Sequence, residues 1–342
     1  MVVNRKAIPV EDISTPAVFS PERYKAAREG AVVYVREDRG RVQLTGGDRR
    51  SYLQGLLTND VGALASGEGC YAALLTPQGR MISDMRVHET GDAVLLVVPI
   101  SAAPRVAAHL ADFIFTEDAQ VDDVTSGVAE MTVVGPRAAE VVGLALPPSR
   151  NRRVVVAGIE VLAAGNDELS VAALDLYVEN DRLPALVAAL AAEGVARVDE
   201  ALFETLRIEA GTPRFGVDMD ESTIPLEAAI EDRAISFSKG CYVGQEVIVR
   251  VMHRGGGRVA RKLVGIAWPA GAGVPVRGTQ LLSGDRQVGA VTSAAFSPSL
   301  GHPVALGYVH RDFTAPGTPL DVAQGTDSAV VVSLPFIGSD AR

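Results

Sequence analysis

Residues 238–246 place a cysteine between two glycines, in the order Ser-Lys-Gly-Cys-Tyr-Val-Gly-Gln-Glu. Such neighbours are unusual for a buried structural cysteine. Lys239, together with a helix expected to start near Gly244, would favour the thiolate form of Cys241. A small apolar residue in a packed turn explains the pattern equally well. Cys241 is therefore a candidate reactive group, and both interpretations stay open.

Asp84 is the second candidate, in the expected strand MISDMRVH. Alternation places Asp84, Arg86 and His88 on one face of this strand. Aspartate is depleted in strand interiors, so its carboxylate needs a partner there. Spacing alone favours an exposed face with an Asp84–Arg86 ion pair. The functional alternative is a carboxylate that points into a cleft, where it orients or protonates a substrate amine.

The sequence also separates negative from positive charge. Residues 199–232 contain ten carboxylates and two arginines, whereas residues 247–284 contain six cations and no carboxylate. Two neighbouring solvated faces are the simpler interpretation. The alternative is a bipolar site, in which carboxylates bind a cationic or amide-like ring and arginines such as Arg254 bind an anionic tail.

Composition and missing motifs exclude several classes of function. The chain has 342 residues, 47% of them hydrophobic, which is typical of a soluble protein of two or three domains. Its net charge of −10 argues against nucleic-acid binding as the main function. The sequence has no phosphate-binding loop or nucleophile elbow, and its histidines lack the spacing of metal ligands. Without a membrane span, or a secretory signal in residues 1–14, we expect a cytoplasmic protein.

Hydrophobic periodicity predicts an α+β fold rather than a doubly wound parallel sheet. Residues 31–44 predict a hairpin with its turn near residues 38–40, and Thr76-Pro77-Gln78-Gly79 predicts the type I turn of a second hairpin over residues 67–85. Further expected elements are a short helix capped by Asp48, helices at 104–113, 181–193 and 200–210 (capped by Asp199), and strands at 93–98, 128–135, 153–163 and 172–178.

The pattern of apolar and turn-forming residues changes at about residue 258. Short β-rich segments then alternate with Gly- and Pro-containing turns, with almost no helical periodicity. This pattern predicts a small separate β-barrel or sandwich over residues 258–342. Its expected strands lie at 259–268, 274–282, 287–296, 303–310 and 328–334.

The segment KGCYVGQE at residues 239–246 closely resembles the signature of the YgfZ family, whose members are folate-binding relatives of the glycine-cleavage T-protein, an aminomethyltransferase. The similarity extends over nearly the whole chain. It covers residues 47–60, 71–85, 206–228 and 305–309. The resemblance implies three subdomains in a ring around a central hole that accepts tetrahydrofolate, with the C-terminal β-barrel as one of them. The remainder, residues 1–257, would form the other two: approximately 1–125 with parts of 199–257, and 126–198.

The resemblance also implies roles for individual residues. Asp84 would lie near the reactive nitrogens of the folate, and Arg207 and Glu209 would border its pterin and tail. T-proteins carry two acids where this chain has Ser83-Asp84, and a pterin-binding glutamate in a region that here offers only Asp175. The complete implied set comprises Cys241 and Asp84 as catalytic residues and Asp84, Arg207, Glu209, Asn59, Arg254 and Lys239 as folate ligands, with no metal.

Three functions follow from these sites. The first is a folate-dependent accessory protein that supports assembly or repair of iron–sulfur clusters in client enzymes, including tRNA-modifying ones, through Cys241 and without contacting nucleic acid itself. The second is a tetrahydrofolate-dependent aminomethyltransferase, in which Asp84 positions the folate nitrogen. The third is a binding module without chemistry, whose basic residues 250–262 dock an acidic partner protein.

Overall fold

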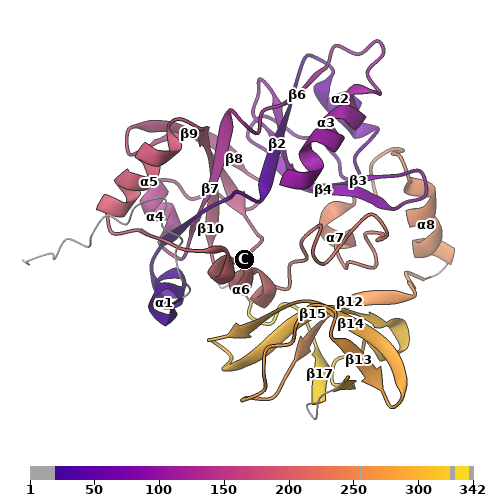
Figure 1. Ribbon diagram of the computed structural model, residues 1–342. Helices are drawn as coiled ribbons and strands as arrows, with labels where there is room; N and C mark the ends of the chain where they lie inside the picture. The colour runs from indigo at the N-terminus through magenta and orange to yellow at the C-terminus, as the bar shows by residue number, and fades with distance from the viewer. Residues whose placement is uncertain (1–19, 255, 324–327, 339–342) are drawn as a thin grey trace, which may run out of the picture.

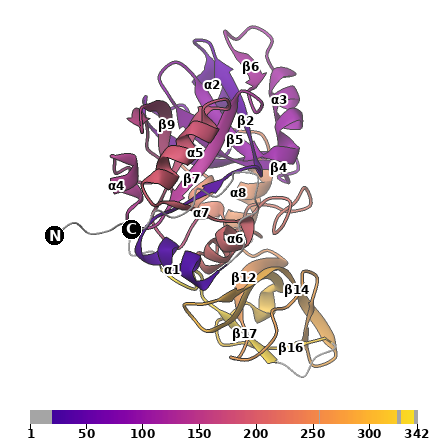
Figure 2. The same ribbon diagram turned by 60° about the vertical axis from the view of Figure 1, so that its left-hand side comes forward.

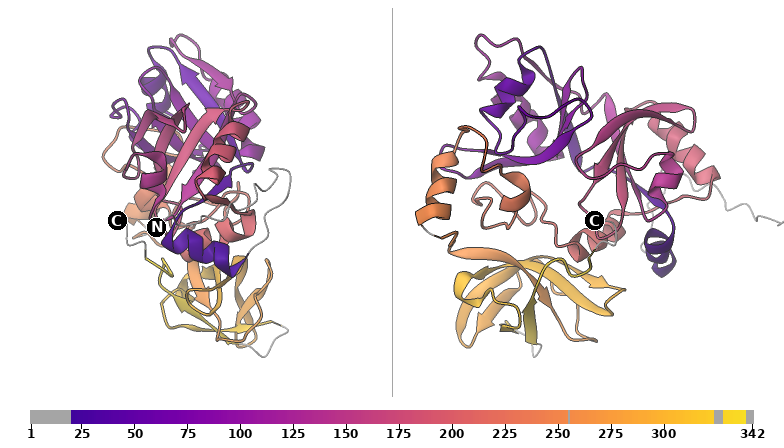
Figure 3. Two further views of the ribbon diagram at one scale, coloured as in Figure 1. Left: turned by 90° about the vertical axis from the view of Figure 1, so that its left-hand side faces the viewer. Right: turned by 180° about the vertical axis from the view of Figure 1, so that it is seen from behind.

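The computed structural model describes residues 20–254, 256–323 and 328–338. The expectation made for residues 1–14 lies outside them. Two sheets with their helices lie on one side of a closed C-terminal barrel (Figure 1), and from behind the three parts surround the centre of the molecule (Figure 3). The predicted α+β fold with a C-terminal β-barrel is confirmed.

The first sheet is antiparallel and five-stranded. Its order is β3 (Gly69–Leu75), β4 (Met81–Glu89), β5 (Val94–Pro99), β2 (Arg39–Thr45) and β6 (Gln120–Asp123). Helices α2 (Arg49–Gln54) and α3 (Ala103–Ala111) pack on one face around a core that includes Leu53, Leu96 and Val106. The predicted hairpin is confirmed, because β3 pairs with β4 and the Gly79 N–H donates to the Thr76 carbonyl at 2.8 Å.

The second sheet has six strands. Its order is β11 (Ala196–Arg197), β1 (Val32–Val35), β7 (Val128–Val134), β10 (Ala173–Glu179), β9 (Ile159–Asn166) and β8 (Asn151–Val156). Helices α4 (Ala138–Val142) and α5 (Leu183–Ala192) cover one face, where Val133, Leu176 and Leu186 are buried. The other face of this sheet packs against the first sheet through Leu162 and Leu95.

The hairpin expected over residues 31–44 is wrong, although both of its strands exist. Strand β1 pairs with β7 in the six-stranded sheet, whereas β2 pairs with β5 in the other. Every residue of β1 is buried. Sequence alternation reports which side chains face a core, but it does not say which strand is the neighbour. Strand β1, assigned above to the subdomain of residues 1–125, therefore lies in the sheet of the other subdomain.

The single strand expected over residues 153–163 is also wrong. Strands β8 and β9 form a hairpin there, in the register Val156↔Ile159. Ala157 and Gly158 make its two-residue turn, both with positive φ, at 49° and 80°. This is the backbone of the tight turns that suit strand twist, and alanine at the first position hides it from a search for glycine pairs.

The barrel closes in the order β12 (Arg261–Ala267), β15 (His302–His310), β14 (Arg286–Ser297), β13 (Gln280–Ser283), β16 (Pro319–Val322) and β17 (Ser328–Val332). Strand β16 was not expected from the sequence. Between β11 and β12 in the sequence come the helices α6 (Glu200–Glu209), α7 (Glu231–Ala234) and α8 (Gln245–Arg254). Helix α6 contacts the barrel, whereas α7 and α8 pack against the first sheet. The predicted cap of α6 is confirmed, because the Asp199 carboxylate accepts from the Leu202 N–H at 2.9 Å.

Glu209, at the end of α6, joins three parts of the chain. Its buried carboxylate accepts hydrogen bonds from Tyr24 and Arg28 of α1 (Pro21–Glu29) and from Ser297 of the barrel. Figure 2 shows α1 and α6 lying just above the barrel. Because several donors converge on one buried charge, loss of that charge leaves them without a partner.

We predict that Glu209→Gln destabilises the protein by about 3 kcal/mol, since it removes a fully buried charge and leaves the Arg28 guanidinium, whose side chain is 17% exposed, uncompensated. The melting temperature measured by scanning calorimetry should fall by roughly 5 °C. The control is Glu29→Gln, because Glu29 makes only an exposed ion pair with Lys25 at 3.8 Å. Equal melting temperatures for the two variants would contradict this role of Glu209.

Candidate functional site

Asp84 lies at the centre of the molecule, on the face of β4 that points toward the second sheet. It is 3% exposed, and its Oδ2 accepts from the Tyr71 hydroxyl at 2.8 Å. Among the described residues, none donates a hydrogen bond to its Oδ1. Burial raises the pKa of this carboxyl, and nearby Arg39 acts in the opposite direction. The exposed face with an Asp84–Arg86 ion pair, favoured by spacing alone, is therefore wrong.

The cavity beside Asp84 is small and lined by charged groups of both signs. It is lined by Asp84 and by Arg39, Tyr71, Arg86, Glu168, Thr212, Pro213 and Arg233. Its volume is ≈ 10 Å³, which is room for about one water molecule. A polar group that enters this cavity meets a carboxylate oxygen without a partner, surrounded by guanidinium groups.

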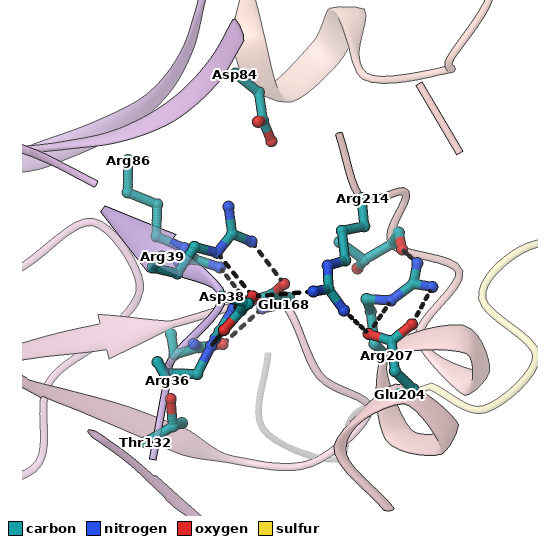
Figure 4. Close-up of polar contacts among 12 residues, drawn as sticks. Arg36, Asp38, Arg39, Asp84, Arg86, Thr132, Glu168, Glu204, Arg207 and Arg214 are labelled. Carbon is teal, nitrogen blue, oxygen red and sulfur yellow. Dashed lines mark hydrogen bonds and ion pairs between the residues drawn. The ribbon is translucent and has the colours of Figure 1, made fainter. Parts of the chain in front are cut away.

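Glu168 holds the arginines of this cavity together (Figure 4). Its carboxylate oxygens lie 3.0 Å from Arg36 Nη1, 3.0 Å from Arg39 Nη2 and 3.6 Å from Arg86 Nη2. Burial opposes ionisation of Glu168, but the guanidinium groups outweigh it and hold its pKa well below the usual range. Because Arg39 and Arg86 belong to the first sheet and Glu168 follows β9, these ion pairs join the two sheets.

A second acid, Asp167, closes the outer side of the same cavity. Its two oxygens lie 3.2 Å from Arg86 Nη1 and 3.0 Å from Arg233 Nη2. The Arg233 guanidinium also covers the Tyr71 ring, 5.1 Å from its centroid. The Asp167 and Arg233 side chains are 36% and 34% exposed, so this ion pair lies between the cavity and solvent.

The ion pairs continue from the cavity toward the barrel. Asp38 binds Arg36 at 2.9 Å and lies 3.7 Å from Arg214, which contacts Glu204 of α6 at 3.0 Å. Burial opposes ionisation of Asp38, yet Arg36 and Arg39 lower its pKa to about 2. Asp38 is therefore ionised at neutral pH.

Arg207 is the last cation of this series and is completely buried. Its guanidinium binds Glu204 at 2.7 Å and Asp218 at 2.8 Å. The same Asp218 carboxylate accepts hydrogen bonds from Thr292 and Ser293 of β14. Neither Arg207 nor Glu209 lines the cavity beside Asp84. A ligand would reach these two predicted folate contacts only after their buried ion pairs opened.

Lys239 and Asn59 connect the Cys241 segment to the cavity. The Lys239 ammonium donates to the carbonyls of Gln54, Leu57 and Asn59 at 2.6, 2.6 and 2.9 Å, and burial lowers its pKa to about 8. The Asn59 amide donates in turn to the carbonyls of Tyr71 and Arg233 at 2.8 and 3.0 Å. Lys239 and Asn59 thus help to position the backbone of Tyr71 and Arg233, whose side chains line the cavity.

Cys241 itself is exposed, and the helix expected near Gly244 begins at Gln245. The ammonium of Lys239 is bound by the carbonyls of residues 54–59, so it does not provide the support for a Cys241 thiolate that spacing suggested. The second cysteine, Cys70, is half-buried, and burial raises its pKa to about 12. Of the two thiols, only Cys241 is placed for reaction with an outside partner.

The oppositely charged segments partly pair with one another. Arg261 lies 3.5 Å from Glu227 and Lys262 lies 3.3 Å from Glu231. These pairs support the simpler interpretation of two neighbouring charged faces. Arg254 is the last residue of α8, but its side chain lies outside the described residues.

Several residues of the site were missed in the sequence. Glu168 and the arginines 36, 39 and 233 were not singled out, and Arg86 was considered only as an ion-pair partner of Asp84. Asp175, which was singled out, is buried and accepts hydrogen bonds from Thr132 and Asn166. A signal existed, because Arg39, Arg41 and Gln43 occupy alternate positions of β2, as do Asp84, Arg86 and His88 in β4. Polar residues at alternate positions of two strands in one sheet indicate that this face of the sheet packs against other polar side chains.

Buried polar residues of the two facing sheets, His88, Tyr177 and Glu130, form what we call the polar seam, and it lies near the cavity. The His88 Nε2 lies 3.2 Å from the hydroxyl of Tyr177 on the opposite sheet. Burial lowers the pKa of His88 to about 3 and raises that of Glu130, on β7, to about 8. Both groups are therefore uncharged at neutral pH.

The described part of the chain contains no cluster of three or more possible metal ligands among its His, Cys, Asp and Glu side chains. Within that part, no helix combines the length and apolar character needed to cross a membrane.

Comparison with solved structures identifies the architecture. The glycine cleavage system aminomethyltransferase T from Bartonella henselae has the same fold, with a TM-score of 0.84 at 22% sequence identity. The match covers 92% of this chain and 89% of that one. The protein is therefore an α+β protein of the T-protein fold class.

Sequence comparison then gives the family. The GCVT N-terminal domain matches residues 8–239, and the glycine cleavage T-protein C-terminal barrel domain matches residues 261–337. The chain belongs to the glycine cleavage T-protein family.

Two relatives, each named aminomethyltransferase, illustrate the similarity. The one from Alkaliphilus oremlandii is 27% identical over 328 residues, which cover 92% of this chain and 88% of the relative. The one from Saccharopolyspora erythraea is 29% identical over 334 residues, covering 93% and 90%. The T-protein part of the predicted resemblance is confirmed, and membership of the YgfZ branch stays a prediction.

We predict that Glu130→Gln reduces the pH dependence of stability. In the folded protein this carboxyl keeps its proton up to about pH 8, whereas in the unfolded chain it ionises near 4.5. The folded state thus binds the extra proton, and the contribution of Glu130 to the unfolding free energy falls as pH rises through this range, by about 1.4 kcal/mol per pH unit.

Urea unfolding at about pH 5.5 and 7.5 measures this effect. Relative to the wild type, Glu130→Gln should gain up to about 3 kcal/mol between the two pH values. The exposed Glu160, on β9, provides the control variant Glu160→Gln, which should follow the wild type. Parallel pH profiles for Glu130→Gln and the wild type would show that Glu130 is ionised in the folded protein.

Proposed function

We propose that this protein binds tetrahydrofolate, or a 5-substituted derivative, with its pterin against Asp84. The observation that carries this proposal is the buried Oδ1 of Asp84, which finds no hydrogen-bond donor among the described residues. The exocyclic amine and ring N–H groups of a pterin are donors that suit a carboxylate. The anionic tail of a folate suits the arginines nearby. The named relatives, which are aminomethyltransferases, add support for one-carbon chemistry.

Side chains must move before a ligand of this size can enter, because the cavity holds about one water molecule. The Asp167–Arg233 ion pair is the weakest part of the enclosure, since both partners are about one-third exposed and solvent screens their attraction. Arg39 also lines a neighbouring pocket of ≈ 190 Å³ that includes Arg214 and Phe215. Movement of Arg39 and Arg233 would join these spaces, and Glu168 would remain to hold the sheets in place.

Asp84 is suited to hold a proton at the reacting end of such a ligand. Its raised pKa lets the carboxyl accept a proton from a ring nitrogen and return it, while the Tyr71 hydroxyl keeps Oδ2 oriented at 2.8 Å. Tetrahydrofolate, when bound, supplies a ring nitrogen that accepts a one-carbon unit. The surrounding arginines would stabilise the ionised form of Asp84 after it has lost its proton.

We further propose an accessory role of the YgfZ type, in which the folate-bound protein supports iron–sulfur clusters in client enzymes. Cys241 favours this function, because it is exposed on a segment that Lys239 fixes to the body of the protein. Phe237, which is 54% exposed, lies four residues earlier and offers an apolar contact to a partner protein. Aminomethyl transfer does not call for a thiol at this position.

The second candidate is aminomethyl transfer itself, of the glycine-cleavage type. The names of the relatives favour aminomethyl transfer over the accessory role. Aminomethyl transfer would use the proton exchange proposed for Asp84 and would not use the Cys241 thiol. The two candidates share the folate site and differ in their dependence on Cys241.

We predict that Asp84→Asn weakens binding of 5-formyltetrahydrofolate at least tenfold, because the amide offers one acceptor oxygen in place of two and carries no charge, so either the Tyr71 hydroxyl or the ligand donor would face an NH2 group. Isothermal titration calorimetry measures the dissociation constant. The control is Asp122→Asn, on the exposed strand β6, which should bind as the wild type does. Unchanged affinity in Asp84→Asn would show that the folate does not bind at Asp84.

We predict that Cys241→Ala folds normally but fails to restore the activity of iron–sulfur enzymes in a strain that lacks this protein. The matched variant Cys70→Ala should restore it. In vitro, iodoacetamide should alkylate Cys241 and leave Cys70 unmodified, because only the first thiol is exposed. Full complementation by Cys241→Ala, together with methylenetetrahydrofolate formation from an aminomethylated carrier protein, would overturn the accessory role and establish aminomethyl transfer.

A further inference from the structure

A second and larger cleft lies between the two sheets, at the end of their interface away from Asp84. Its volume is ≈ 500 Å³, within the range of small-molecule sites. None of its lining residues also lines the cavity beside Asp84. Strands β2 and β5 contribute one wall, and β8, β9 and β10 contribute the other. Figure 1 shows β2, β8, β9 and β10 above α6 and the barrel.

The floor of this cleft is apolar and its back is closed by a polar contact. Leu95 on one sheet and Leu162 and Tyr177 on the other form the floor, and all three are buried. Behind them, the Tyr177 hydroxyl meets His88 Nε2 at 3.2 Å. The polar seam described above therefore begins where the cleft ends, and an occupant of the cleft contacts the Tyr177 ring rather than the seam.

The register of the second sheet places the guanidinium of Arg153 at the outer edge of the cleft. Arg153 on β8 pairs with Leu162 on β9, which pairs with Tyr177 on β10, so the three side chains form one row on the same face. The row crosses two strand spacings, about 10 Å. Its outer member, Arg153, is 54% exposed. Among the described residues its one ionic partner is Asp92, which is 70% exposed and lies 3.3 Å away.

A further guanidinium and two carboxylates complete the rim. Arg182, just before α5, lies 4.0 Å from Asp181, and both side chains are more than 60% exposed. Glu160 and Glu179 also line the cleft. Exposed ion pairs of this kind contribute little to stability, so an incoming anion can replace Asp92 at Arg153 at small cost.

We propose that this cleft binds a small molecule that carries an apolar ring and one anionic group. The apolar body would lie over Leu162 and Tyr177, and the anion would bind Arg153. A bicyclic aromatic body matches the length of the row. This site is separate from the proposed folate site and does not depend on it.

The probe that tests this proposal is 8-anilinonaphthalene-1-sulfonate, a bicyclic aromatic sulfonate whose fluorescence rises in apolar sites. It should bind the folded protein with a stoichiometry near one. Arg153→Glu should raise its dissociation constant at least tenfold. The matched control is Arg152→Glu, since Arg152 is an exposed neighbour that does not line the cleft; it should change the constant less than twofold.

Two additional measurements keep the result interpretable. Circular dichroism should be identical for both arginine variants, because both side chains are exposed and their strand is retained. Val124→Trp, which places a large ring beside Leu95, Leu162 and Tyr177, should also abolish binding of the probe. Equal affinities for the two arginine variants would overturn the proposal. Displacement of the probe by an equimolar amount of 5-formyltetrahydrofolate would also overturn it, because the cleft would then be the folate site.

Discussion

The buried carboxylate of Glu168 is the interaction on which the arrangement of this protein depends. It binds Arg36 from the β1–β2 link, Arg39 from β2 and Arg86 from β4, close to the end of β9. In this way it joins two sheets that share no hydrogen-bonded strand. Removal of one partner from a buried ion pair typically costs about 3–5 kcal/mol, because the remaining charge is left without solvent. Such a cluster tolerates few alternative placements of the two sheets. The geometry of the cavity at Asp84 follows from that restriction.

The same charges explain why the cavity beside Asp84 is small and why Asp84 can both bind and release a proton. Arg39, Arg86 and Arg233 fill the space beside Asp84, so the cavity offers little volume. Their positive charge opposes the effect of burial on the Asp84 carboxyl, which leaves a group able to hold or release a proton. The Glu168 ion pairs are buried, whereas the outer pair of Asp167 and Arg233 is partly exposed. If Arg39 moves to admit a ligand, Arg36 and Arg86 still hold Glu168 between the two sheets.

Local signals predicted many of the elements that carry the site. The β3–β4 hairpin followed from its Pro-Gln-Gly turn, α6 from the Asp199 cap, and the barrel from short strands between Gly- and Pro-containing turns. These features depend on neighbours in the chain, which the sequence displays directly. The pairing of β1 with β7 did not follow, because alternation of apolar residues identifies a buried face and leaves the partner strand open. The burial of Asp84 was missed for the same reason, since its strand faces a second sheet that is remote in sequence.

The sequence by itself determined the fold class, the position of the barrel, the family resemblance, and the candidacy of Asp84 and Cys241. Only the tertiary structure decided what those residues contact. Lys239 binds three carbonyls of the α2 segment, and Arg207 and Glu209 are enclosed in ion pairs that reach the barrel and α1. Glu168 became visible as the centre of the site only when its arginine partners, 82 to 132 residues away, came together around it. Residue types specify which charges a chain must bury, but the long-range packing of the two sheets selects which of them meet.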